Sequence, residues 1–222
     1  MTVQQLNETT SHQVDLTMDK SDEMLSMTVR DFLASAAAKT PTPGGGSVAA
    51  VTGALAAALG EMALNFTSGK KKYAEHQDIY DRIAPRLTRA RRMFEDLAGD
   101  DAAAYEFFRE TTAMEDSPEK TERMSLAVAA AIDVPRELTK VAMAVLSDLK
   151  ELSDKCNRYL LSDLLASAAL AAVAVRLSDY NVRINARQLP AAEADDVRAS
   201  SAEDLAHAER LRDDIESTAG LD

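Results

Sequence analysis

The 222-residue chain has a single cysteine, Cys156, and only three histidines. One thiol cannot form an internal disulfide bond or a thiolate metal site, a pattern that fits a reducing cytoplasm. Two of the histidines stand in segments that look peripheral, so we expect no three-histidine metal site. Eight glycines and six prolines are too few for a fibrous or low-complexity chain, and 46% apolar content is ordinary for a folded globule.

Positive charge is also scarce, since 25 Lys and Arg face 37 Asp and Glu, a formal net charge of −12. Such a chain repels phosphate backbones and acidic membrane surfaces, so we expect neither nucleic acid nor a membrane as partner. Residues 69–92 reverse this sign. This basic segment is either a patch that steers an anionic small molecule or a solvated helix face. Its basic residues are Lys70, Lys71, Lys72, Arg82, Arg86, Arg89, Arg91 and Arg92.

A convincing membrane or export segment is missing. Residues 1–26 lack the apolar stretch of a signal peptide and are predicted to be a flexible leader. Residues 47–66 approach the length that crosses a bilayer, but they are mostly alanine and include Glu61; residues 160–175 are shorter and contain Asp163. Both are predicted to be buried helices of a soluble, cytoplasmic protein.

What the chain does have is apolar residues spaced three and four apart along nearly all of its length, with no alternating strand pattern. We therefore predict an all-α fold, an antiparallel bundle of about five to six helices formed by residues 27–189. A polar helix in residues 190–222 should pack on or beside it. The first helix is expected at residues 28–38, and a second begins at residue 47. A third is expected at 73–112, with a kink or restart at Pro85, and a fourth at 117–152, with a bend at Pro135. After a break at 154–159, a long apolar helix should continue to about residue 187, and a last one should cover about 190–217.

The loop from Pro41 to Ser47 is the most informative local feature. Gly44, Gly45 and Gly46 lead directly into a helix, where free N–H groups of the first turn can face an anion or a carbonyl. The spacing of a Walker phosphate loop is absent. The alternative is a tight turn that only joins two helices.

Two carboxylates stand in unexpected places. Asp101 falls on an apolar helical stripe, where burial would raise its pKa toward the range useful for proton transfer at neutral pH. The alternative is that it faces solvent beside Asp100. Asp163 is the one charged residue in its apolar run, and it either serves a site or, with Ser162 and Asn157, caps the start of a helix.

Taken together and in this order, these motifs resemble the cyclodeaminase/cyclohydrolase family of folate enzymes. The resemblance covers about residues 28–189. Its members include the cyclodeaminase domain of formiminotransferase-cyclodeaminase and bacterial methenyltetrahydrofolate cyclohydrolases. The residues that carry it are Pro41–Val48, Gly69–Tyr73, Asp101-Ala102 with Tyr105, Val134-Pro135, Asn157 with Ser162-Asp163, and Asn181–Asn185.

The resemblance implies an all-α homodimer that dimerises through its bundle and binds a tetrahydrofolate derivative as substrate, with no metal and no permanently bound cofactor. It implies that Asp101 is the catalytic acid and base, and that Lys70 and Lys71 meet the glutamate tail of folate. The remaining residues that it implies line or support the pocket are Gly44, Gly45, Gly46, Ser47, Asn157, Ser162 and Asp163.

The first interpretation of the activity is cyclodeamination, in which 5-formiminotetrahydrofolate closes to 5,10-methenyltetrahydrofolate and ammonia leaves. The alternative is the cyclohydrolase reaction, in which water opens the methenyl ring. A non-enzymatic helical module is a further alternative, motivated by Tyr159 and Glu115, where many members of the family have an asparagine and a lysine.

Overall fold

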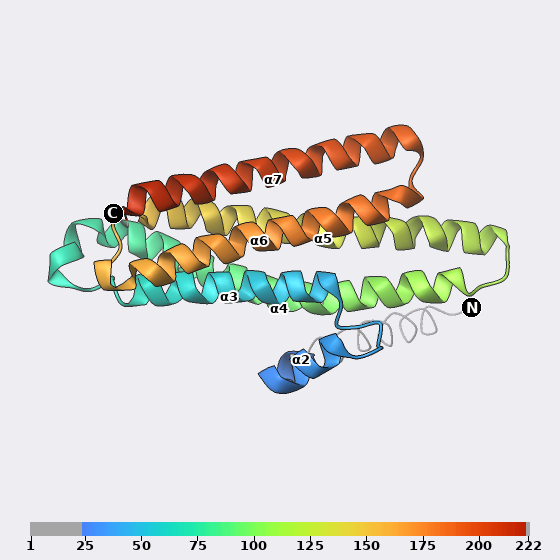
Figure 1. Cartoon of the computed structure of the whole chain (residues 1–222), viewed down its shortest axis with the longest axis horizontal. Coiled ribbons are helices and arrows are strands. Elements are labelled where there is room, and N and C mark those ends of the chain that lie inside the picture. The colour runs from blue at the N-terminus through green and yellow to red at the C-terminus, as the bar shows by residue number, and fades with distance from the viewer. Residues whose placement is uncertain (1–23, 221–222) are drawn as a thin grey trace, which may run out of the picture.

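The computed structural model describes residues 24–220, and all regular secondary structure in that range is helical. Five long helices run back and forth along the long axis of the molecule (Figure 1). They are α3 (Gly45–Asn65), α4 (Gln77–Thr112), α5 (Pro118–Leu152), α6 (Leu161–Asn185) and α7 (Ala191–Ala219). A shorter helix, α2 (Val29–Ala37), precedes them. The prediction of an all-α, antiparallel bundle is confirmed, while residues 1–23 of the predicted leader lie outside the described residues.

The helix boundaries follow local capping chemistry. The side chain of Thr28 accepts a hydrogen bond from the backbone N–H of Asp31 at the start of α2. Ser117 does the same for Lys120 ahead of Pro118, whose missing N–H costs nothing in a first turn. Pro85 and Pro135 both lie inside continuous helices, so Pro85 does not begin a new helix. Three short 3₁₀ segments complete the chain: η1 (Lys71–His76), η2 (Arg158–Leu160) and η3 (Ala186–Gln188).

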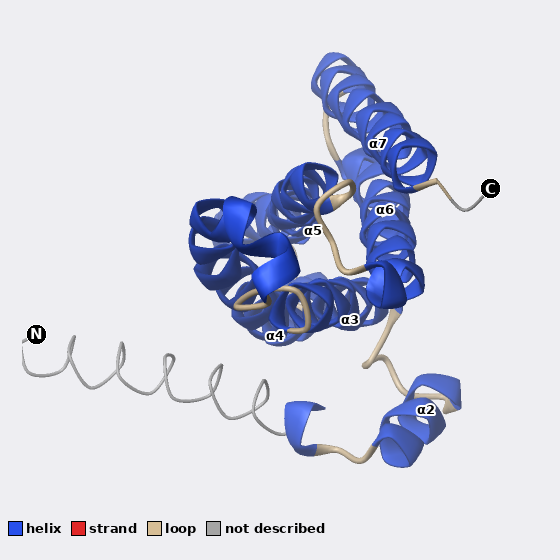
Figure 2. Cartoon of the chain, turned by 90° about the vertical axis from the view of Figure 1, so that its left-hand side faces the viewer, coloured by secondary structure: helices blue, strands red, loops and turns tan. Residues whose placement is uncertain are grey.

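Helices α3, α4, α5 and α6 form the core of the molecule, with α3 packed between α4 and α6 and α5 between the same two neighbours (Figure 2). Helix α7 packs on α6 and α5 through Ala208, Leu211 and Ile215. The centre is filled by large, fully buried side chains, among them Tyr80, Phe94 and Leu87 of α4. Helix α2 has no buried residue and lies beside this core.

The seam between α3 and α4 sets the register of the site. Gly46, Gly53 and Gly60 recur every seven residues along α3, which keeps them on one face of the helix. Asp101 and Phe94 of α4, also seven residues apart, stand opposite Gly46 and Gly53. A Cβ on Gly60 would first meet Leu149 of α5 and Ser167 of α6, with Leu87 of α4 slightly farther away. Because glycine has no side chain, each α4 residue can approach the α3 backbone closely.

Helix α3 and the segment 158–188 around α6 are each long and apolar enough to span a membrane by length and composition. In the bundle, 50% and 44% of their most apolar windows are buried. The prediction that both segments are buried helices therefore holds for only about half of each apolar window. The other half leaves large apolar side chains exposed on the outer face of α3 and α6.

The α3–α4 seam predicts that Gly53→Ala destabilises the fold. A Cβ at position 53 would lie 2.4 Å from Cε1 of Phe94, and a buried aromatic ring cannot swing away as a flexible chain end can. Overpacking of this kind costs about 1–3 kcal/mol. Urea unfolding should show that loss for Gly53→Ala. In the control Gly45→Ala, where the nearest atoms are 3.9 Å from the added carbon, the free energy of unfolding should not fall.

Candidate active site

The first turn of α3 lacks a side-chain cap of its own. Gly44, the residue at the N-cap, adopts an extended conformation and has no side chain that could accept a hydrogen bond. The N–H groups of the following residues are therefore available to another partner. The glycine loop joins α2 to α3, as a simple turn would. It also places the uncapped N-terminus of α3 against α4.

Asp101 of α4 occupies that helix end. Oγ of Ser47 donates a hydrogen bond to Oδ2 of Asp101 at 2.9 Å, and the backbone N–H of Ser47 donates to the same carboxyl group. A Cβ on Gly46 would lie 1.9 Å from Oδ1 of Asp101, so the contact requires glycine at position 46. The neighbouring Asp100 is exposed. Of the two orientations left open by the sequence, the structure has Asp101 facing the loop.

The environment of Asp101 raises its pKa. Removal of the carboxyl group from water is the largest cause, and the two hydrogen bonds from Ser47 oppose it only in part. No cation pairs with Asp101 among residues 24–220. The result is a carboxyl group that holds a proton more readily than an ordinary aspartate and still has two fixed donors to stabilise it when charged.

A cavity of about 320 Å³ opens beside this carboxyl group. The sequence predicts its glycines and Asp101 as site residues but does not predict Asn181 and Asn185, which also line it. They are one turn apart on α6, a spacing that places both on the same face of the helix. The wall residues beyond the glycines and Asp101 are Pro41, Thr42, Ala104, Tyr105, Phe108, Ala131, Val134, Asn181 and Asn185.

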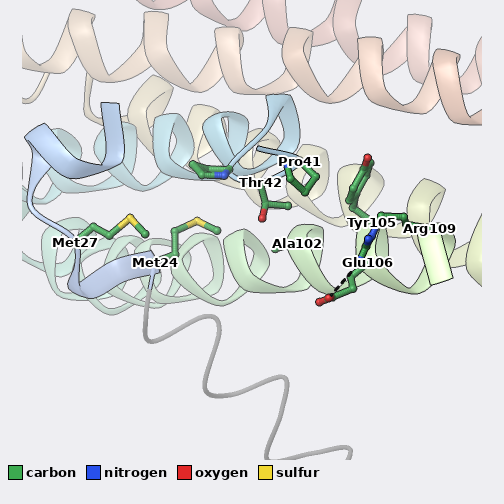
Figure 3. Close-up of a pocket in the computed structure, with 9 residues that line it drawn as sticks. Met24, Met27, Pro41, Thr42, Ala102, Tyr105, Glu106 and Arg109 are labelled. Carbon is green, nitrogen blue, oxygen red and sulfur yellow. Dashed lines mark ion pairs between the residues drawn. The ribbon is translucent and has the colours of Figure 1, made fainter. Parts of the chain in front are cut away.

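A second cavity, of about 270 Å³, adjoins the first and shares Pro41, Thr42 and Tyr105 with it. Figure 3 shows this cavity between the loop and α4, with Met24 and Met27 toward one end and the ion pair of Arg109 with Glu106 toward the other. The first cavity thus lies among α3, α4, α5 and α6, and the second lies beside it between the loop and α4.

The other five predicted site residues lie at the opposite end of α3. Lys70 and Lys71 follow its C-terminus, and Ser162 and Asp163 stand in the first turn of α6. Helix α3 has 21 residues, so the two ends are about 30 Å apart. Within one chain, the structure therefore brings together Asp101, Ser47 and the three glycines, but not the lysines or the α6 residues.

Asn157 has a structural role in this second group. Its Nδ2 donates to the carbonyl of Phe66 at 3.1 Å, its backbone N–H to Oγ1 of Thr67 at 2.9 Å, and its Oδ1 accepts from the N–H of Tyr159. These bonds tie the end of α3 to the start of α6. Neither Ser162 nor Asp163 caps α6 with a side-chain hydrogen bond.

The basic segment 69–92 is divided in two by its ion pairs. Arg82, Arg86 and Arg91 pair with Glu151, Asp148 and Glu61, so this part is a paired helix face. Lys70, Lys71 and Lys72 form no ion pair with any described residue, and Lys72 lies over the ring of Tyr73 at 5.3 Å. Arg89 and Arg92 of α4 also form no ion pair with any described residue, so unpaired positive charge lies both at the far end of α3 and on α4.

Across the described chain, residues 24–220, no three His, Cys, Asp or Glu side chains gather as metal ligands would. The polar side chains that line the cavity carry carboxyl, hydroxyl and amide groups. Those groups can move a proton and hold a polar ligand.

The formiminotransferase-cyclodeaminase family model matches residues 28–204, which include the loop, Asp101 and both asparagines. The chain belongs to the formiminotransferase-cyclodeaminase family. The match extends beyond residue 189 into α7.

Several relatives within this family have names that state an activity. The methenyltetrahydrofolate cyclohydrolase of Methylorubrum extorquens is 30% identical over 167 residues, which are 73% of this chain and 80% of that protein. The formimidoyltransferase-cyclodeaminase of Mus musculus is also 30% identical, over 75% of this chain but only 32% of the longer mouse protein. The crystal structure of formiminotetrahydrofolate cyclodeaminase from Thermotoga maritima superposes with a TM-score of 0.75 at 28% identity, over 87% of this chain and 94% of that one.

The raised pKa of Asp101 predicts a pH-dependent effect of Asp101→Asn on stability. The folded protein favours the protonated carboxyl, so this residue contributes stability below the ordinary aspartate pKa, and the contribution is lost as pH rises through the raised value. Asp101→Asn should therefore be more stable than the wild type at pH 7, with a gain that shrinks toward pH 4.

Thermal unfolding across that pH range measures the effect. The exposed Glu122→Gln serves as control and should show no comparable trend. A less stable Asp101→Asn at pH 7 would mean that capping of α3 by the charged carboxylate outweighs the cost of its burial.

Proposed function

We propose that this protein is a formiminotetrahydrofolate cyclodeaminase, with Asp101 as its proton carrier. The observation that carries the proposal is the partly desolvated carboxyl group of Asp101, fixed by Ser47 at the mouth of a cavity of about 320 Å³. The family membership and the cyclodeaminase of similar fold support the same conclusion.

The reaction needs a group that first accepts and later returns a proton. N10 of 5-formiminotetrahydrofolate attacks the formimino carbon, and the carbon becomes tetrahedral between N5, N10 and the departing nitrogen. The formimino group reacts in its protonated form, so its nitrogen already carries two hydrogens. Asp101 takes the N10 proton and delivers it to that nitrogen, whose bond to carbon breaks as ammonia leaves and the cationic 5,10-methenyltetrahydrofolate forms. A pKa raised toward neutrality serves both steps, because the group must be unprotonated before attack and protonated before departure.

No metal or resident cofactor takes part in this scheme, and the tetrahydrofolate derivative enters as a substrate. The cyclohydrolase reaction is the second candidate. It is favoured by the Methylorubrum extorquens relative, which the chain matches over 80% of its length. Both reactions pass through a tetrahedral carbon between two nitrogens, so they need the same proton carrier. The single buried Cys156 supports a reducing, cytoplasmic setting.

Asp101→Asn should lower kcat by about 10² to 10⁴-fold, the usual contribution of general acid–base catalysis, and leave the fold intact. Gly46→Ala should also impair turnover, since its methyl group displaces the carboxyl without removing it. The matched control is Asp100→Asn, an exposed carboxylate outside the cavity, which should keep wild-type turnover.

Two assays measure these variants and distinguish the candidate reactions. Ammonia release from 5-formiminotetrahydrofolate reports cyclodeamination, and loss of methenyl absorbance reports the cyclohydrolase. Undiminished kcat in folded Asp101→Asn would contradict the role of Asp101. Wild-type protein inactive in both assays would contradict the enzymatic proposal and favour a non-enzymatic helical module.

We further infer that the protein is a homodimer that forms through the outer face of α3 and α6. Large apolar side chains stand half exposed along both helices, which lie side by side in the bundle. The three on α6 are seven and four residues apart, which aligns them as a stripe, and the other two are 11 residues, about three helical turns, apart. An apolar surface of this kind is typical of an interface between subunits. The residues are Leu55 on α3, Phe66 at the C-cap of α3, and Val173, Tyr180 and Ile184 on α6.

A second copy on this face would also complete the site. In a two-fold dimer, the α3 helices of two subunits can run antiparallel, so the glycine loop of one lies near the C-terminal end of α3 in the other. Lys70 and Lys71 would then reach the cavity from the partner, where their free charge suits the carboxylates of the folate tail. The dimer would thus bring the residues around Asp101 in one subunit close to the residues at the opposite end of α3 in the other, which include Ser162 and Asp163.

A mixed dimer tests the shared site. One subunit carries Asp101→Asn and the other the double change Lys70→Glu and Lys71→Glu, and differently tagged copies allow purification of the hybrid. With shared sites, one of the two sites regains all its wild-type residues, so the hybrid should show about half of wild-type turnover although each parent dimer is impaired. If the hybrid were no more active than the mean of its parents, the lysines would not act across the interface. Sedimentation checks that every sample is dimeric.

A further inference from the structure

The side-chain amides of Asn181 and Asn185 are each held by a backbone carbonyl group. Nδ2 of Asn185 donates to the carbonyl of Ala131 on α5 at 2.7 Å. Nδ2 of Asn181 donates to the carbonyl of Leu177 on its own helix at 2.9 Å. Both side chains line the cavity of Asp101. These bonds fix which end of each amide remains available to a ligand.

The bond from Asn185 has a cause in the sequence of α5. In an α-helix, the carbonyl of Ala131 would accept from the N–H of residue 135, but position 135 is proline and has no N–H. Asn185 supplies the missing donor from the neighbouring helix. Its NH₂ group is thereby directed toward α5, which leaves Oδ1 as its free polar atom.

Asn181 is held more simply. The carbonyl of Leu177 lies four residues earlier in α6, where it is already the ladder acceptor for the backbone of Asn181, so the side-chain bond adds a second donor. The amide head faces Gly45, whose Cβ position would be 3.9 Å from both Nδ2 and Oδ1. Among residues 24–220, no donor contacts Oδ1 of either asparagine.

We propose that the two oxygens, Oδ1 of Asn181 and Oδ1 of Asn185, accept hydrogen bonds from the aminopyrimidine edge of the reduced pterin ring. This inference rests on the proposed folate substrate. That edge presents the 2-amino group and N3–H, which are donors and need acceptors when they leave water. A pair of carbonyl oxygens one helical turn apart provides them, while Asp101 remains free for the reacting nitrogens. The two asparagines are thus residues that position the substrate and determine specificity.

Asn185 has a structural role as well as the proposed role in binding, and the substitution Pro135→Ala distinguishes these two roles. Asn185→Leu leaves the carbonyl of Ala131 without a donor, so it should lower Tm as well as affinity. Pro135→Ala restores the backbone N–H that can satisfy this carbonyl. The double variant should therefore regain Tm and still bind tetrahydrofolate weakly. Asn181→Leu leaves the ladder bond of Leu177 intact and should reduce affinity with little change in Tm.

Calorimetric titration of the full chain with tetrahydrofolate measures the affinity. Each Asn→Leu variant should bind about tenfold more weakly than the wild type, as expected for one hydrogen bond lost. Pro135→Ala alone is the control and should bind as the wild type does. Recovery of full affinity in the Pro135→Ala, Asn185→Leu double variant would show that Asn185 acts only through the backbone of α5, and would overturn its part of the proposal.

A ligand change identifies the contact itself. The wild type should prefer tetrahydrofolate over its 2-deamino analogue by about tenfold, and at least one of the two variants should lose this preference. Preference retained in both variants would overturn the assignment to the pterin edge. Turnover is a separate readout. A wild-type protein that binds tetrahydrofolate but acts on neither folate would contradict the proposed activity, while the amide contacts could still stand.

Discussion

The structure depends on the contact between the carboxyl group of Asp101 and the uncapped start of α3. Helix α3 begins at glycines and has no capping side chain of its own, and α4 supplies an acceptor in its place. The contact requires the bare backbone of Gly46, because any β-carbon there would collide with the carboxyl. One interaction thus joins two helices, completes a helix terminus and holds an ionisable group at the edge of a cavity.

Capping and proton transfer make opposite demands on that carboxyl group. A helix N-terminus favours the charged form, as do the two donors of Ser47, whereas removal from water favours the neutral form. Desolvation is the larger effect here. The balance raises the pKa of Asp101 above that of an ordinary aspartate, which suits a single residue acting first as base and then as acid.

Sequence periodicity was sufficient for the fold because nearly every helix is amphipathic or uniformly apolar, with recognisable caps at Thr28 and Ser117. It also drew attention to Asp101, whose charge interrupts an apolar stripe. It could not decide between Asp101 and Asp100, since adjacent helix positions differ by only 100°. The role of Asn185 was hidden for another reason. Its partner is a carbonyl group on a different helix, freed by a proline fifty positions away in the chain.

The seven-residue spacing of the α3 glycines limits how the length of this chain can change. Gly46 and Gly53 must stay opposite Asp101 and Phe94, and one inserted residue in either helix turns the following part of its seam by about 100°. A single insertion between Gly46 and Gly53 would therefore place a β-carbon against the ring of Phe94 or the carboxyl of Asp101. Loss or gain of one whole heptad in both helices together would preserve the seam, so evolution can alter the length of the bundle most easily in paired steps of seven.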